Sequence, residues 1–138
     1  MLRSIMAVVA GYATMAVVVM LGTIAMMAAL VPGGLKAMRA MRDGARAAMP
    51  APTPRYLAMN IALSLVAAIL GGWITTRIAS RAVNGHLIAL CVVVLLMSVV
   101  SAFASGSGSS LQPAWYKFVI PLVGVAGVAL SALLTQSA

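Results

Sequence analysis

The chain alternates between long apolar stretches and short segments that carry most of its charged residues. Residues 5–31 contain no charged side chain and exceed the roughly 20 residues that an α-helix needs to cross a bilayer. A signal peptide that begins near Arg3 is the alternative, but its apolar region would extend for only about 7–15 residues. The pattern recurs along the chain and predicts membrane-spanning helices over residues 5–31, 55–79, 86–104 and 113–135.

Turn-forming residues separate these stretches. Pro32 and the two glycines after it end the first, and an Asn-Gly dipeptide at 84–85 predicts a turn before the third. The uncharged segment 105–110 is typical of a linker, because it lacks the lysine that would follow a phosphate-binding glycine loop. The predicted fold class is therefore all-α, a single membrane domain over residues 1–138 that forms a bundle of four transmembrane helices.

The segment 35–49 differs from the rest of the chain, because it combines several basic residues with the only acidic side chain, Asp43. At about 100° per residue, its charged side chains fall on one face of a helix, and the other face carries Met38, Met41, Ala45, Ala48 and Met49. This pattern predicts a basic amphipathic helix in the headgroup plane of an anionic leaflet. A solvated basic loop that only sets the topology is the alternative. The basic residues of the segment are Lys36, Arg39, Arg42 and Arg46.

Composition also places the chain in a membrane. Hydrophobic residues make up 64% of the chain and charged residues 7%, against about 25% charged residues in an ordinary soluble domain. The net charge of +8 predicts contact with anionic lipid headgroups and not with nucleic acid, because the basic segment has no aromatic side chains on which bases stack. The single cysteine, Cys91, has no partner in the chain for a disulfide.

The basic residues also predict an orientation. Four spans place the connections 32–54 and 105–112 on one side of the membrane and both chain ends on the other. Most basic residues fall on the first side, which favours loop 32–54 in the cytoplasm, although Arg3 favours the opposite orientation of the first helix. The preference for arginine, alanine and glycine suggests a bacterial protein, and hence the inner membrane.

Tryptophans and basic residues mark the expected membrane interfaces. Trp73 precedes Arg77 by one helical turn, and Arg77 shares a helical face with Arg81, so we expect an anchor whose arginines reach lipid phosphates. A second belt opens the last helix and consists of Trp115, Tyr116 and Lys117.

Small residues spaced four apart predict where helices pack closely. Helices in lipid have no hydrophobic driving force for association, so their contact depends on close approach at small side chains. The two pairs that we single out are Ala68 with Gly72, and Gly127 with Ser131.

Side chains for catalysis are scarce. Apart from Asp43 the chain has no acidic residue, and one histidine is not enough for an acid–base pair or a metal cluster, so we expect no enzymatic activity and no metal site. His86 could serve as an axial ligand to haem or a chlorin, although a histidine beside a turn is more often an interfacial polar residue. Asn60 could contact a solute, although a hydrogen bond to a neighbouring helix is its more common role.

Several motifs in the C-terminal two-thirds of the chain resemble those of small bacterial four-helix inner-membrane proteins of unknown function. They are the Gly-Gly-Trp sequence at 71–73, the short arginine-bearing turn, His86, and the Gln-Pro-Ala-Trp-Tyr sequence at 112–116. The resemblance implies fold and location, and it implies no activity.

Two functions from different classes remain. The first is a structural or accessory subunit of a larger membrane assembly, which would associate with other membrane subunits or with itself. The alternative is a small homo-oligomeric channel or carrier for a neutral or anionic solute. Its candidate lining residues are Asn60, Ser64, Thr75 and Arg77.

Overall fold

The computed structural model contains four long helices. It describes residues 2–30, 33, 34, 36, 39, 53–79, 83–104 and 113–136. The helices are α1 (Leu2–Leu30), α3 (Pro54–Ile78), α4 (Val83–Ala104) and α5 (Ala114–Gln136). Each is long and apolar enough to cross a membrane, over Ser4–Leu30, Pro54–Ile78, Val83–Val100 and Trp115–Thr135. The prediction of an all-α fold is confirmed in the described part of the chain, and so is that of four helices with the length and apolar character of membrane spans. The chain has the features of a multi-pass membrane protein.

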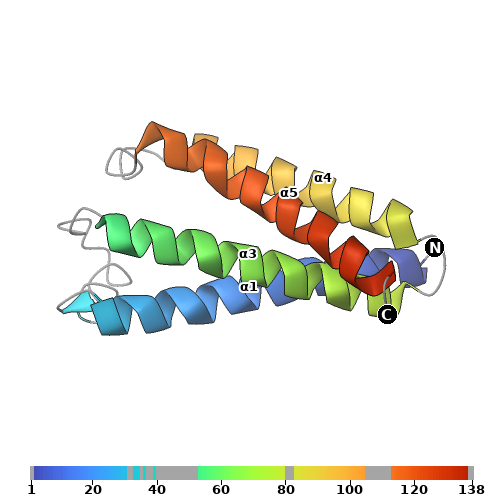
Figure 1. Cartoon of the computed structure of the whole chain (residues 1–138), viewed down its shortest axis with the longest axis horizontal. Helices are drawn as coiled ribbons and strands as arrows, with labels where there is room; N and C mark the ends of the chain where they lie inside the picture. Colours follow the sequence, from blue (N-terminus) through green and yellow to red (C-terminus); the bar gives the residue numbers. More distant parts are fainter. Residues whose placement is uncertain are drawn as a thin grey trace.

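Successive helices run in opposite directions, so α3 and α5 are parallel to each other (Figure 1). We call the end of the bundle that holds both chain termini the terminal end. It contains the start of α1, the end of α3, the start of α4 and the end of α5 (Figure 1). The opposite end, where α3 and α5 begin, is called the loop end.

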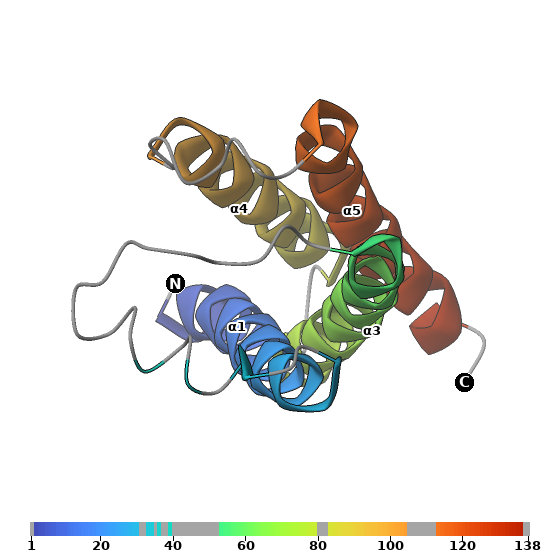
Figure 2. The same ribbon diagram turned by 90° about the vertical axis from the view of Figure 1, so that its left-hand side faces the viewer.

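Helix α3 is the central element, because it packs extensively against both α1 and α5. Helix α4 packs mainly on α5 and has fewer contacts with α1 and α3. Figure 2 shows the helices from the loop end, with the α1–α3 pair and the α4–α5 pair side by side. The core lies toward the terminal end and consists of Met15, Ala68, Leu87, Leu90, Val94 and Val128.

The start of α3 follows from its local sequence. Thr53 is the N-cap, and its side-chain oxygen accepts a hydrogen bond from the backbone N–H of Tyr56 at 3.3 Å. Pro54 occupies the first turn, where its missing N–H leaves no helical hydrogen bond unmade.

Helix α4 begins earlier than the sequence predicts. The Asn-Gly dipeptide at 84–85 lies in its first turn and not in the preceding connection. Asparagine and glycine are among the residues preferred at helix N-termini, so the dipeptide is compatible with this position. His86 therefore also belongs to the first turn of α4.

Most of the basic segment 35–49 lies outside the described residues. Within it the structure describes only Lys36 and Arg39, and both are exposed. Just before it, Gly33 has a φ of 74°, a left-handed conformation that favours glycine at the end of a helix. The amphipathic interfacial helix remains a prediction.

Candidate functional site

The two small-residue pairs meet each other between α3 and α5, at what we call the α3–α5 seam. A Cβ atom on Gly127 would lie 2.5 Å from the Cβ of Ala68 and 3.0 Å from the carbonyl oxygen of Leu65. A Cβ atom on Gly72 would overlap the hydroxyl of Ser131 and lie 2.8 Å from its Cβ. The close approach predicted for these residues is thus made within the chain, between two parallel helices.

A second close contact, the α1–α3 seam, joins Gly11 to Gly71. A Cβ atom on either glycine would lie 2.7 Å from the backbone oxygen of the other. Thr75 completes the seam, since its buried hydroxyl lies 2.9 Å from the Gly71 oxygen on its own helix and 3.3 Å from the Ala7 oxygen on α1. No spacing in the sequence pairs Gly11 with Gly71, because the two glycines lie on different helices.

Asn60 and Tyr116 form a polar contact between α3 and α5 near the loop end. The Asn60 Nδ2 group donates a short hydrogen bond to the Tyr116 hydroxyl. Tyr116 is only 5% exposed, so its position differs from the interfacial belt that the sequence predicts. The buried Oδ1 atom of Asn60 accepts no hydrogen bond from the described residues. The asparagine therefore links two helices, the more common of the two roles considered for it.

We expect Asn60→Leu and Tyr116→Phe to destabilise the bundle by similar amounts, because each removes one partner of the same hydrogen bond. Interhelical hydrogen bonds in membrane proteins contribute about 0.6 kcal/mol on average and at most about 1.7 kcal/mol. A double-mutant cycle, measured by unfolding in mixed detergent and SDS micelles, should give a coupling energy in this range. Strict additivity of the two substitutions would show that the contact does not stabilise the fold.

The aromatic and basic residues at the two ends of the bundle differ in their surroundings. At the terminal end, the guanidinium carbon of Arg77 lies 5.1 Å from the centre of the half-exposed Trp73 ring, a cation–π contact. At the loop end, Trp115 is exposed and meets the Tyr116 ring edge-on, with ring centres 5.8 Å apart. Lys117 is half-buried. Arg42, Arg46 and Arg81 lie outside the described residues.

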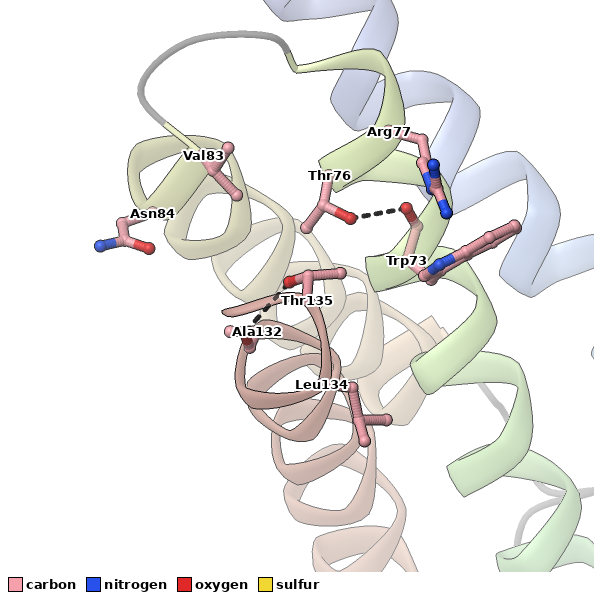
Figure 3. A pocket seen from close by; sticks show the side chains of 8 residues that line it. All are labelled: Trp73, Thr76, Arg77, Val83, Asn84, Ala132, Leu134 and Thr135. Carbon is pink, nitrogen blue, oxygen red and sulfur yellow. Dashed lines mark hydrogen bonds between the residues drawn. The ribbon is translucent and has the colours of Figure 1, made fainter. Parts of the chain in front are cut away.

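An open pocket of about 440 Å³ lies at the terminal end, between the ends of α3 and α5 and the start of α4. Figure 3 shows Arg77 and Trp73 together on one side of α3, and Thr76 on the side that faces Thr135 of α5. Thr76 donates a hydrogen bond to the Trp73 oxygen at 2.7 Å, and Thr135 bonds to carbonyl oxygens of its own helix. The lining residues are Trp73, Thr76, Arg77, Val83, Asn84, Ala132, Leu134 and Thr135.

The candidate lining residues of a solute path differ in their partners and in their exposure. Asn60 bonds to α5, whereas Thr75 is buried against α1. The hydroxyl of Ser64 donates to the backbone oxygen of Asn60 at 2.8 Å, and Arg77 is exposed beside Trp73. The structure does not bring these four side chains to one surface within a single copy of the chain.

His86 is half-buried in the first turn of α4. Among the described residues, no three His, Cys, Asp or Glu side chains come close enough together to hold a metal ion. The contact of His86 with haem or a chlorin remains a prediction, and its test is a visible absorption band that is lost on His86→Ala.

Comparison with known proteins gives no relative from which a function could be transferred: no family model, curated protein or solved structure matches the chain.

Proposed function

We propose that this protein is a structural or accessory subunit of a larger membrane assembly and has no catalytic activity of its own. Its polar and small intramembrane side chains support this proposal, because those in the two seams and in the Asn60–Tyr116 contact join helices of the same chain. We place it in a bacterial inner membrane with loop 32–54 in the cytoplasm, on the distribution of its basic residues.

The loop-end half of α4 supports this proposal most directly, because its apolar side chains are exposed. In the terminal half of this helix, Leu87, Leu90 and Val94 are buried at helical spacing, and Leu90 is fully buried. From residue 95 to residue 100 every side chain except Ser98 is exposed. Five exposed positions in six consecutive residues face every direction around a helix. Residues 95–100 of α4 therefore have little packing against the described part of the bundle.

We propose that a transmembrane helix of another subunit covers this half of α4. The exposed side chains are apolar and include Leu96, which is 59% exposed. A second helix would bury them by close packing, as Leu90 and Val94 are buried in the other half. Lipid chains could cover the same surface instead, and photo-crosslinking distinguishes a partner helix from lipid.

A photo-crosslinking amino acid at Leu96 should give an adduct with one specific larger protein in the native host at native expression. The same label at Ile88 is the matched control, because this residue is on the same helix and 65% exposed, but belongs to the half that packs on the bundle. We expect the control to link to lipid only. Native mass measurement after purification in mild detergent should show the same partner in a fixed ratio.

Two results would overturn the accessory function. Lipid adducts alone at both positions, with a chain that purifies without a partner, would show that lipid covers α4. An adduct between two copies of this chain would instead favour the homo-oligomeric channel or carrier. In that case Asn60→Leu should abolish solute flux without loss of expression.

A further inference from the structure

We propose that the pocket at the terminal end binds the phosphate group of an anionic ligand, with Arg77 as its principal contact. This inference goes beyond the proposed accessory function and stands whether or not a partner subunit exists.

The first reason is the unmatched charge of Arg77. The guanidinium carbon lies 5.1 Å from the centre of the Trp73 ring, and this cation–π contact leaves the positive charge without an anionic partner. Within the described part of the chain it forms no ion pair, and the only acidic side chain of the sequence, Asp43, lies outside the described residues. Nine basic residues against one acidic residue require counter-charge from outside the chain. A phosphate group supplies that charge and accepts two hydrogen bonds from one guanidinium.

The second reason is the position of α4. Val83 and Asn84 line the pocket and are the first two residues of this 22-residue helix. The N–H groups of a first turn have no carbonyl partner within the helix, and the helix dipole places partial positive charge there. Val83 and Asn84 lie across the pocket from Arg77 (Figure 3), so the start of α4 adds N–H donors at the opposite wall and not beside the guanidinium. The amide of Asn84 is a further N–H donor among the lining residues, whereas the hydroxyls of Thr76 and Thr135 already donate to backbone oxygens of their own helices.

The third reason is the mixed character of the pocket. Trp73, Val83, Ala132 and Leu134 give it apolar walls beside these polar groups. Its volume of about 440 Å³ falls within the roughly 300–1,000 Å³ of small-molecule sites. A phosphate ester with an apolar or glycerol portion matches both parts. Such a group comes either from a phospholipid headgroup or from a soluble phosphate, and both sources present the same chemistry to Arg77.

The test uses the full chain in detergent and two probes. Native mass spectrometry follows retention of phosphatidylglycerol against diacylglycerol, which lacks the phosphate. In a Trp115→Phe background, fluorescence of Trp73 follows a titration with inorganic phosphate. We expect phosphatidylglycerol to be retained in preference to diacylglycerol, or inorganic phosphate to saturate the fluorescence change. Saturation by inorganic phosphate would identify a soluble phosphate as the ligand. Retention of phosphatidylglycerol without saturation by inorganic phosphate would identify a lipid headgroup.

Matched variants make the assignment specific. Arg77→Gln should weaken binding of the active probe about tenfold or more, as expected for the loss of a charge-assisted hydrogen bond. Arg55→Gln is the control, because it removes the same charge from an exposed position of α3 at the loop end, and it should leave binding within about twofold. Thr135→Leu fills the pocket without a change of charge and should also weaken binding, which keeps the test decisive if Arg77→Gln does not fold.

The inference would be overturned by any of three results. These are equal retention of phosphatidylglycerol and diacylglycerol without phosphate saturation, equal losses in Arg77→Gln and Arg55→Gln, or unchanged binding in both Arg77→Gln and Thr135→Leu.

Discussion

Gly71→Leu is expected to force α1 away from α3 and to lower the free energy of unfolding by about 3 kcal/mol or more. A Cβ atom at this position would lie 2.7 Å from the backbone oxygen of Gly11 and would overlap the side chain of Met15. The methionine can rotate away, but the backbone oxygen moves only if α1 moves. Membrane helices have no hydrophobic driving force to restore the contact, so close packing that is lost here has no substitute.

The measurement is unfolding in mixed detergent and SDS micelles, followed by tryptophan fluorescence and helical circular dichroism. Gly85→Leu on α4 is the matched control, because a Cβ atom there would meet nothing within 4 Å. We expect this control to shift the unfolding midpoint far less than Gly71→Leu. Equal midpoints for the two variants would contradict the close α1–α3 approach.

The second large effect is expected at the α3–α5 seam, where Gly127→Ala should lower the free energy of unfolding by about 1–3 kcal/mol. The new Cβ atom would lie 2.5 Å from the Cβ of Ala68, an atom that no side-chain rotation can move. It would also lie 3.0 Å from the oxygen of Leu65. The two parallel helices would have to separate, and the Asn60–Tyr116 hydrogen bond between them would weaken.

The test of this seam is a double-mutant cycle with Ala68→Gly. The second substitution removes the atom that the new methyl group meets, so Gly127→Ala combined with Ala68→Gly should recover much of the stability lost by Gly127→Ala alone. Additive losses would mean that these residues do not face each other. Because the seam lies within one chain, a Gly127 variant tests the stability of the bundle and not the binding of a partner subunit.

The number and extent of the helices could be predicted from the sequence. The thickness of the hydrocarbon core sets the length of an apolar stretch, and this is a local property that needs no knowledge of neighbours. The structure accordingly begins α3 at Pro54, within one residue of the prediction, and differs most at the starts of α1 and α4, which begin three residues earlier than predicted, at Leu2 and Val83. The close-packing role of Ala68, Gly72, Gly127 and Ser131 was also visible, since small side chains at a spacing of four share a helical face.

Which faces meet was decided only by the tertiary structure. Gly71 and Gly72 are adjacent in sequence, and positions one residue apart on a helix differ in direction by about 100°. Gly71 therefore faces α1 while Gly72 faces α5, and no sequence pattern assigns either neighbour. The environment of Tyr116 also could not be predicted from the sequence. Its place beside Trp115 and Lys117 indicates an interface, yet the position of Asn60 on another helix draws its hydroxyl into the bundle. Helix formation depends on each segment and the solvent around it, whereas these pairings depend on the relative placement of segments that are far apart in the chain.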